Sequence, residues 1–508
     1  MRDFFYRPEK GYVGDVIPYY EDGIYYLYFL YASRKKYEEE NREKREEGTS
    51  WYLVTTRDFI HYKEYGEVLA HGTEEDQDLN AYTGSIYKND GVYYLYYTGY
   101  NAHSEFRVQG EPLQAVMMAK SDNLFTWEKL PEKTFYASED YYEFSDWRDP
   151  FVFWNEERKE YEMLLAARQR KGSRRKRGCV GLCRSDNLLD WKASEAYYAP
   201  GLYMTHECPE AFRMGRWKYL LFSTFSERFA THYRIVGAAE GDFVSPREDT
   251  FDGRGFYAGK TASDGEKRFI FGWVPTKKEE NDYGDYEWAG NLVVHELLQR
   301  KNGILYAGMP SVIKRYFQQE VPFLLNKICG NLSKEKNGRF RMNGRNLFSA
   351  AVTEEEVPGR CLITVKTCFE EGTRALGILL RSDGEAEQSY YIRLEPYRNR
   401  MVFDMWPRKI KGENEDTWEI NGDKPFFPEL ERDCPLKPGE EYVISVLVDD
   451  TVCVVYMEGM TAMTSRIYNI KRGRLGVFVS EGCGEFYDLS IKRNSKDNRE
   501  RQGRNEGS

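Results

Sequence analysis

Three acidic residues stand at matching places in a repeated pattern, and carboxylates that a fold brings together can do acid–base chemistry. Counting back the same short distance from each of five long apolar segments reaches Asp15, Thr83, Asp149, Glu207 and Tyr257. Acids commonly stand at strand starts as turn residues or surface ion pairs. Crowded carboxylates, however, raise one another's pKa and destabilise the fold, so three at equivalent positions favour a functional site.

The five long segments are predicted to be the second strands of five β-sheet units. They are GIYYLYFLY, GVYYLYYTG, EYEMLLAAR, WKYLLFSTF and KRFIFGWV. Downstream of the first three stand TRDFIHYKEYG, SDNLFTWEKLP and SDNLLDWKASE, whose shared aromatic positions are Tyr62, Trp127 and Trp191. Regular repeats of short strands predict a five-bladed β-propeller. Its first strands line one channel, where we expect the three acids to meet.

The composition agrees with an all-β protein of two domains. The chain has 508 residues, 16% aromatic residues and 40 Tyr, and a chain of this length exceeds a single core. We expect a propeller over 1–310, a linker over 311–320, a β-sandwich over 321–493 and a disordered tail over 494–508. The sandwich is predicted from alternating apolar segments such as RCLITVKTCF and EYVISVLVDD. Its expected roles are propeller support, a homodimer contact or sugar binding.

The charge and the cysteines exclude several classes of function. A net charge of -10 argues against nucleic-acid binding, and no apolar stretch is long enough for a membrane span. The N-terminus MRDFFYRPEKGYVGD lacks a signal-peptide core, and nine cysteines without framework spacing fit reduced thiols. We therefore expect a cytoplasmic protein. No spacing typical of metal ligands is present, so no metal and no cofactor are expected.

The sequence resembles glycoside hydrolase family 32, the β-fructosidases that include invertases, levanases and inulinases. The segments WRDPFVFW and HECPEAF are similar to the family's Arg-Asp-Pro and Glu-Cys-Pro motifs. Further matches are AYTGSIY, FDGRGFYAGKT, FIFGWV and EWAGNLVVHELLQRKNGILYAGMP, so the resemblance covers residues 5 to 310. It implies a five-bladed propeller followed by a β-sandwich, and an enzyme that acts on small carbohydrates.

The resemblance also implies roles for individual residues. Asp15 would be the nucleophile, Glu207 the general acid/base and Asp149 a stabiliser of the transition state. We expect crowding to keep Glu207 protonated at neutral pH and hydrogen bonds to keep Asp15 charged. A retaining mechanism predicts about 5 to 5.5 Å between the carboxyl groups of Asp15 and Glu207. The expected substrate-binding residues are Arg148, which would also orient Asp149, and Tyr82, Thr83, Gly84, Ser85, Tyr257 and Trp288.

The first family motif departs from its usual form. It normally reads Trp-Met-Asn-Asp-Pro-Asn-Gly, whereas the aligned stretch here is GYVGDVIPYYEDG. Asp15 is kept, but Gly14 takes the place of an Asn that helps to hold the fructosyl unit in the family. The resemblance therefore indicates the reaction class more firmly than the substrate.

Three functional hypotheses remain open from the sequence. The leading one is a retaining hydrolase that cleaves terminal fructofuranosides from sucrose, sucrose 6-phosphate or short fructo-oligosaccharides. The second is an inverting furanosidase of arabinan or xylan type on the same scaffold. The third is a propeller that binds glycans without turnover. Within the site, Glu210 is an alternative to Glu207 as the acid, because both lie in HECPE.

A basic loop adds a question about substrate charge. Residues 168–177, RQRKGSRRKR, join two strands of the third repeat and are expected at the rim of the channel. A solvated surface loop explains such a charge run without any ligand. The alternative hypothesis is that the loop attracts a phosphorylated sugar.

Overall fold

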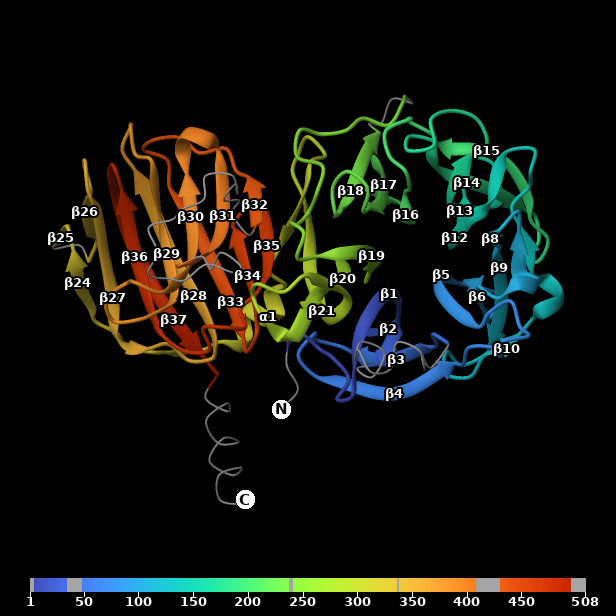
Figure 1. Cartoon of the computed structure of the whole chain (residues 1–508), viewed down its shortest axis with the longest axis horizontal. Helices are drawn as coiled ribbons and strands as arrows, with labels where there is room; N and C mark the ends of the chain where they lie inside the picture. The colour runs from blue at the N-terminus through green and yellow to red at the C-terminus, as the bar shows by residue number, and fades with distance from the viewer. Residues whose placement is uncertain (1–3, 34–47, 237–240, 336–337, 408–429, 495–508) are drawn as a thin grey trace, which may run out of the picture. The chain divides into compact units, whose positions relative to one another are not determined.

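The computed structural model describes residues 4–33, 48–236, 241–335, 338–407 and 430–494. Within these residues nearly every regular element is a β-strand, so the protein is all-β (Figure 1). The chain forms two compact units. The first unit is Arg2–Pro275 with Trp288–Leu305, and the second unit is Thr276–Glu287 with the chain from Tyr306 onward.

The helical elements of the described residues are all short. They are the α-helix α1 (Ser311–Tyr316) and the 3-10 turns η3 (Ser104–Phe106), η4 (Pro131–Lys133), η5 (Lys278–Glu280) and η6 (Pro396–Arg398). None of the helices in the described part of the chain has the length and apolar character needed to cross a membrane. The predicted tail, 494–508, lies outside the described residues from 495 onward.

Antiparallel sheets make up the first unit, and strands that follow one another in the chain pair side by side. The first sheet has β1 (Gly11–Glu21), β2 (Ile24–Ser33), β3 (Trp51–Thr56) and β4 (Tyr62–Leu69). The second has β5 (Asn80–Asn89), β6 (Val92–Tyr100), β9 (Gln114–Ser121), β10 (Glu128–Lys129) and β11 (Phe135–Tyr136), with a small ribbon of β7 (Arg107–Val108) and β8 (Glu111–Pro112) nearby in sequence.

Three further groups of strands follow the same plan. They are β12 (Tyr142–Asn155), β13 (Glu160–Gln169), β14 (Gly178–Ser185) and β15 (Lys192–Tyr198); then β16 (Glu207–Met214), β17 (Trp217–Thr224) and β18 (Ala230–Val236); and last β19 (Tyr257–Ser263), β20 (Arg268–Lys277), β21 (Tyr286–Gln299) and β22 (Leu305–Gly308). The last group shares a sheet with the first, because Val13 of β1 pairs with Gly290 of β21.

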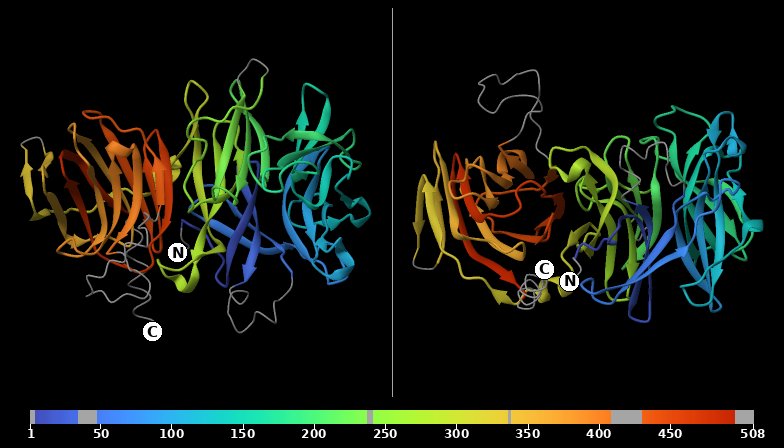
Figure 2. Two further views of the ribbon diagram at one scale, coloured as in Figure 1. Left: turned by 45° about the horizontal axis from the view of Figure 1, so that its top comes forward. Right: turned by 60° about the horizontal axis from the view of Figure 1, so that its bottom comes forward.

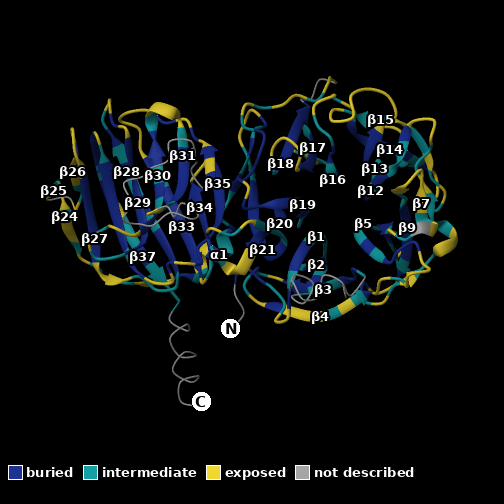
Figure 3. Ribbon diagram, in the orientation of Figure 1, coloured by how far each residue is buried: buried dark blue, intermediate teal, exposed yellow. Residues whose placement is uncertain are grey.

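The first strand of each group lies inside the unit. Strand β1 contacts β5, β5 contacts β12, β12 contacts β16, β16 contacts β19, and β19 contacts β1. Figures 1 and 2 let the reader follow these strands, and Figure 3 shows that buried and intermediate residues are mixed along most of them. The five long segments predicted from the sequence are the second strands β2, β6, β13, β17 and β20, which confirms their predicted place.

The three similar segments of the sequence form the same turn after the third strand of a sheet. In the second copy, the hydroxyl of Ser121 accepts a hydrogen bond from the backbone N–H of Leu124 at 3.0 Å. Asn123 Oδ1 accepts two more N–H groups, and Leu124 takes a left-handed φ of 68°. The first and third copies repeat these bonds. The repeat therefore encodes a turn held by side chains.

Two antiparallel sheets, packed face to face, build most of the second unit (Figures 1 and 2). One contains β25 (Asn331–Lys334), β26 (Phe340–Asn343), β37 (Cys483–Arg493), β28 (Arg360–Phe369), β33 (Tyr442–Asp449), β34 (Val452–Met457), β35 (Thr461–Arg466) and β23 (Gln319–Glu320). The other contains β24 (Leu325–Cys329), β27 (Phe348–Glu356), β36 (Arg474–Ser480), β29 (Ala375–Ser382), β30 (Ser389–Glu395), β31 (Arg400–Trp406) and β32 (Leu430–Asp433).

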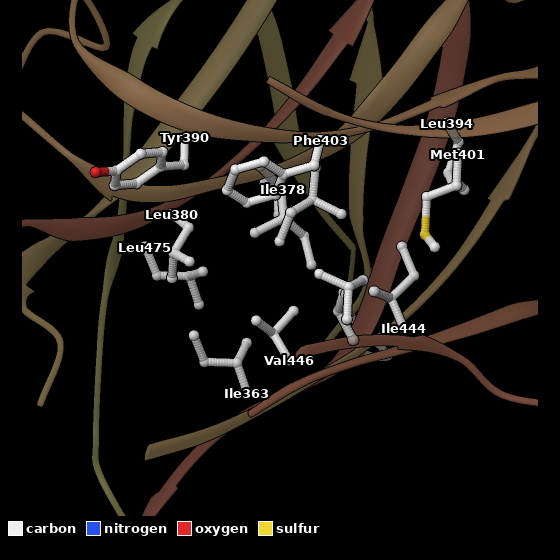
Figure 4. Packing of buried hydrophobic residues seen from close by; sticks show 14 of the residues in the cluster. Ile363, Ile378, Leu380, Tyr390, Leu394, Met401, Phe403, Ile444, Val446 and Leu475 are labelled. Atoms are coloured by element: carbon white, nitrogen blue, oxygen red, sulfur yellow. The ribbon is translucent and has the colours of Figure 1, made fainter. Parts of the chain in front are cut away.

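Alternating apolar residues of the two sheets form the core of the second unit. Ile363 of β28 and Val446 of β33 come from one sheet, and Ile378 of β29 and Phe403 of β31 come from the other. Figure 4 shows these side chains meeting between the sheets. Each exposes 1% or less of its surface. This core is the hydrophobic layer that period-two alternation predicts.

Candidate active site

A bulge interrupts each inner strand of the first unit at the residues selected from the sequence. The pairing with the second strand shifts between Val13 and Val16, Tyr82 and Gly84, Arg148 and Phe151, Glu207 and Glu210, and Tyr257 and Lys260. A β-bulge leaves residues unpaired and re-aims their side chains. The five bulges therefore explain how strand residues can direct polar groups toward one place.

The bulges also show that the five positions selected from the sequence are not structurally equivalent. Arg148, Glu207 and Tyr257 each form the last regular pair before a bulge. Asp149 comes one residue later and has a left-handed φ of 57°, as do Cys208 and Ala258 with 49° and 53°. Asp149 is thus equivalent to Cys208 and not to Glu207. Counting residues missed this offset because the unpaired residues of a bulge leave no trace in apolar spacing.

Side chains of two other strands, β5 and β20, hold Asp15. Its Oδ2 accepts a hydrogen bond from the hydroxyl of Thr83 at 2.6 Å, and its Oδ1 accepts one from Trp273 Nε1 at 2.9 Å. The Sγ of Cys208 lies 3.8 Å from Oδ2. Both carboxylate oxygens therefore have fixed directions.

The bulges supply the backbone groups that hold Asp149. The backbone N–H of Cys208, on β16, donates to Asp149 Oδ2 at 2.9 Å. The N–H of Asp149 itself donates to the hydroxyl of Thr98 on β6 at 2.8 Å, and Thr98 donates to the carbonyl of Thr83 at 3.0 Å. Asp149 exposes only 4% of its surface. A buried carboxylate needs such partners.

Glu207 is bound on both oxygens by side chains of neighbouring strands. Arg148 Nη2 donates to its Oε1 at 3.0 Å, and the hydroxyl of Tyr257 donates to its Oε2 at 2.6 Å. Arg148 Nε lies farther from Asp149 Oδ2, at 3.9 Å. The sequence predicted that Arg148 orients Asp149, whereas the shorter contact of Arg148 is with Glu207.

Burial is the largest cause of the raised pKa values of Asp15 and Glu207. It raises the pKa of Asp15 to about 6, although the hydrogen bonds from Thr83 and Trp273 oppose the change. It also raises the pKa of Glu207, against the attraction of Arg148 and with a contribution from the charge of Asp149. The predicted direction for Glu207 holds, but burial is a larger cause than crowding. Asp15 stays mostly charged at neutral pH, as predicted, although burial raises its pKa well above the usual value of a carboxyl group.

The other reactive groups of HECPE are Cys208, which contacts Asp15 and Asp149, and Glu210, which binds Thr261. Burial raises the pKa of the Cys208 thiol well above its usual value, so the thiolate is disfavoured. Glu210 exposes 2% of its surface and accepts hydrogen bonds from the N–H and hydroxyl of Thr261. Its carboxylate therefore holds β16 to β19, whereas Glu207 faces Arg148 and Tyr257.

The remaining predicted binding residues divide into two kinds. Gly84 and Ser85 serve strand packing: a Cβ on Gly84 would meet the carbonyl of Tyr96 at 1.8 Å, and the Ser85 hydroxyl accepts the N–H of Val152 at 3.1 Å. Tyr82 stacks on Tyr100 with ring centroids 5.6 Å apart. Burial raises the pKa of Tyr82 to about 12, and the charge of Asp15 contributes. Tyr82 therefore lies within electrostatic range of the acids.

Trp288 explains the glycine that replaces the family's asparagine. A Cβ built on Gly14 would lie 2.7 Å from the ring of Trp288 and 2.9 Å from the carbonyl of Leu30. Trp288 also packs edge to face on Trp273, with centroids 6.3 Å apart. The indole of Trp288 thus lies against the backbone beside Asp15, where a side chain at position 14 would stand.

Nearby acids neutralise part of the basic loop. Arg168 and Arg177 pair with Glu143, Arg170 pairs with Glu139, and Lys176 pairs with Glu227. Among the described residues, no ion pair is found for Lys171, Arg174 or Arg175. A phosphorylated substrate stays a hypothesis that rests on these exposed cations.

Sequence reasoning missed several groups that hold the acids or Arg148. These groups are Trp273, which lies in the family-like segment FIFGWV, and Thr98, Thr205, Gln114 and Asp146. The one available signal was the pairing of β19 with β20, which places Trp273 opposite Tyr257. Thr98, Thr205 and Gln114 are distant in sequence from the residues they contact. Asp146 lies only two residues from Arg148, which it contacts.

Comparison with known proteins gives the family. The model of the glycosyl hydrolases family 32 N-terminal domain matches residues 6–307. The raffinose invertase of Escherichia coli is 26% identical over 332 residues, which are 59% of this chain and 63% of that protein. The sucrose-6-phosphate hydrolase of Vibrio alginolyticus is 24% identical over 296 residues, 54% of this chain and 57% of that protein. The chain thus spans less than two thirds of the length of either relative.

The fold has solved counterparts as well. The structure of fructan 1-exohydrolase IIa from Cichorium intybus superposes with a TM-score of 0.70 at 16% identity, covering 96% of this chain and 98% of that one. At this identity the likeness concerns the fold. The match of the family model to more than half of the sequence shows that the chain belongs to glycosyl hydrolase family 32.

Proposed function

We propose that the protein is a retaining glycoside hydrolase that removes terminal fructofuranosyl units from sucrose, sucrose 6-phosphate or short fructo-oligosaccharides. One observation carries the proposal: Cys208, the neighbour of Glu207, contacts Asp15 through its sulfur and Asp149 through its N–H. Asp15, Asp149 and Glu207 are therefore brought close to one another, because Cys208 contacts the first two and is bonded to the third. Relatives named as a raffinose invertase and a sucrose-6-phosphate hydrolase support the substrate class.

In the first step Asp15 attacks the anomeric carbon of the fructosyl unit. With a pKa of about 6, the carboxylate is mostly ionised at neutral pH, and the bonds from Thr83 and Trp273 fix its oxygens. Glu207, whose pKa is raised, donates its proton to the leaving oxygen. The glycosidic bond breaks, an ester to Asp15 forms, and the released sugar carries the proton.

In the second step water replaces Asp15. Glu207, now ionised, takes a proton from the water as the oxygen attacks the anomeric carbon, and the ester bond to Asp15 breaks. Arg148 and Tyr257 stabilise the charge on Glu207 between the two steps, because both donate to its carboxylate. Asp149 would accept sugar hydroxyls, with one oxygen already fixed by the N–H of Cys208.

The proposal includes a five-bladed propeller for the first unit and a β-sandwich for the second. The contacts of β1, β5, β12, β16 and β19 in cyclic order support five blades. The two facing sheets of the second unit support the sandwich. A cytoplasmic location is also proposed, because all nine cysteines are free.

The test is a substrate screen with matched variants of the two glutamates in HECPE. Sucrose, sucrose 6-phosphate, inulin-type and levan-type oligosaccharides and difructose anhydrides are incubated with the wild type, Glu207→Gln and Glu210→Gln. We expect turnover by the wild type and a loss of about 10²- to 10⁴-fold for Glu207→Gln. Glu210→Gln should keep turnover and lose stability, because Glu210 ties β16 to Thr261.

The stereochemistry of the released fructose separates the remaining hypotheses. Retention of the anomeric configuration supports the proposal, and inversion would indicate the second hypothesis of the sequence analysis. Binding of these sugars without turnover, unchanged by Glu207→Gln, would indicate a glycan-binding protein instead.

A further inference from the structure

Arg148, the cation on Glu207, is itself held by a set of side chains that the sequence did not reveal. Its Nη2 donates to the hydroxyl of Thr205 at 2.9 Å as well as to Glu207. Its Nη1 pairs with the carboxylate of Asp146 and lies 3.4 Å from Gln114 Oε1. The two amino groups of one guanidinium thus divide between Glu207 on one side and Asp146 on the other.

The contacts continue beyond Asp146 with alternating charge. Arg168 Nε lies 3.7 Å from Asp146 Oδ2 and 3.5 Å from Glu143 Oε2. Glu143 also pairs with Arg177. We name the sequence Glu207, Arg148, Asp146, Arg168, Glu143, Arg177 the charge ladder. It runs from the candidate proton donor to the two ends of the basic loop.

The charge ladder is shielded from solvent over most of its length. The exposed fractions of the side chains are 7% for Arg168, 12% for Asp146 and 15% for Arg148. Shielded charges are only weakly screened, so they act on one another more strongly than surface pairs do. Removing one charged side chain of the ladder leaves the opposite charges beside it without a partner.

The basic loop is anchored by the same ladder. Arg168 Nη2 donates to the carbonyl of Arg174 at 2.5 Å, so the arginine that faces Asp146 also holds the middle of the loop. Two of the loop's cations therefore serve the interior of the unit. This gives a structural use to a segment that the proposed reaction leaves without a role.

We propose that Asp146 and Arg168 are positioning residues, which act through Arg148 to hold Glu207 in place and to set its proton affinity. The proposal rests on the proposed function, in which Glu207 is the proton donor. The other charged or titratable groups facing Arg148 and Glu207 are Asp149 and Cys208 from β12 and β16, Tyr257 from β19 and Asp15 from β1. None of these is changed in the test below.

Because the charges of the ladder alternate in sign, Asp146→Asn and Arg168→Gln should shift the pKa of Glu207 in opposite directions. Asp146→Asn removes an anion that draws on Arg148, so Arg148 acts more fully on Glu207 and the pKa of Glu207 falls. Arg168→Gln removes a cation beside Asp146, so Asp146 draws more strongly on Arg148 and the pKa of Glu207 rises. The basic limb of the kcat/KM profile on sucrose should move to lower pH in the first variant and to higher pH in the second, each by about half a unit or more.

The effect on rate separates the two variants further. Asp146→Asn also frees one side of the guanidinium, so kcat should fall about tenfold while KM changes less. Arg168→Lys keeps the charge and should leave the basic limb where the wild type has it. Arg175→Gln, an exposed cation of the same loop outside the ladder, is the matched control and should change neither kcat nor the limb.

The outcomes distinguish this proposal from the proposed function. Thermal unfolding verifies that each variant is folded, and Arg168→Lys supplies the comparison if Arg168→Gln is unstable. The proposed role of the charge ladder is wrong if the basic limb stays fixed in both Asp146→Asn and Arg168→Gln, or if it moves in the same direction in both. Glu207 would then remain the proton donor. Full activity of Glu207→Gln would instead overturn the proposed function.

Discussion

The two units of the protein bury opposite kinds of side chain at their centres. In the second unit, Ile363 and Phe403 lie on regular strands among apolar neighbours (Figure 4). In the first unit, the inner strands carry Asp15, Asp149 and Glu207 at bulges, and Asp149 has a left-handed backbone. The first arrangement stabilises the fold, whereas the second places charge where burial disfavours it. The difference teaches that this chain separates the residues that stabilise it from those that react.

The largest expected effect is the one that separates activity from stability at Asp15. Asp15→Asn should reduce kcat by about 10⁴-fold or more, because the nucleophile is lost. The pKa of Asp15 is raised from 3.8 to about 6, so the folded state binds this proton more tightly than the unfolded chain. The charge therefore destabilises the fold as pH rises through this range, and Asp15→Asn should raise the free energy of unfolding at pH 7 by about 1–3 kcal/mol.

Denaturant unfolding of the wild type and the variant at pH 4 and pH 7 checks this prediction. The stabilisation should appear at pH 7 and shrink at pH 4. A variant that loses both activity and stability at pH 7 would mean that Asp15 is a structural residue.

A core substitution in the second unit should give the reverse result. Ile378→Ala removes a side chain that is 1% exposed, and the free energy of unfolding of this unit should fall by about 2–5 kcal/mol. The kcat of the folded enzyme should stay close to that of the wild type. Parallel measurement of unfolding and of turnover below the transition checks this. A fall in kcat without loss of folded protein would contradict the separation of roles.

The contact between Gly14 and Trp288 gives a smaller effect. Gly14→Asn restores the residue usual in the family motif, but its Cβ would collide with the Trp288 ring and the Leu30 carbonyl. We expect a loss of about 1–3 kcal/mol of stability together with reduced activity. Trp288→Ala in the same chain should recover part of the stability, as a double-mutant cycle would show. Additive losses in that cycle would mean that the two positions are independent.

The smallest effect concerns the acid limb of the pH profile. The hydroxyl of Thr83 donates to Asp15 and lowers its pKa, against the larger effect of burial. Thr83→Val removes this bond, so the pKa of Asp15 should rise above about 6. The acid limb of kcat/KM should therefore move to higher pH by about half to one unit. Ser85→Ala, a matched loss of a hydroxyl on the same strand, should leave the limb in place.

Much of the fold could be predicted because its strands are marked by local patterns. The long apolar second strands and the turn that begins at Ser121 or Ser185 repeat in the sequence and in the structure. The alternation in the second unit likewise marked the strands that form its apolar core. These features depend on neighbouring residues, which a sequence displays directly.

The finer geometry of the site could not be predicted, because it depends on long-range contacts. Trp273 lies 258 residues from Asp15 in the sequence, and no local pattern shows that it donates to that carboxylate. The shift between Asp149 and Glu207 depends on bulges, which apolar spacing does not record. The pairing of Arg148 with Glu207 instead of Asp149 follows from that shift.

The central claim is that Asp15 forms a bond to the sugar while Glu207 handles the proton. Glu207→Gln, supplied with a fructoside whose leaving group needs no proton, should form the ester and hydrolyse it slowly. Mass spectrometry of the quenched and digested enzyme should then find one fructosyl unit on the peptide that contains Asp15. No sugar on any peptide, or a sugar on a peptide without Asp15, would contradict the account.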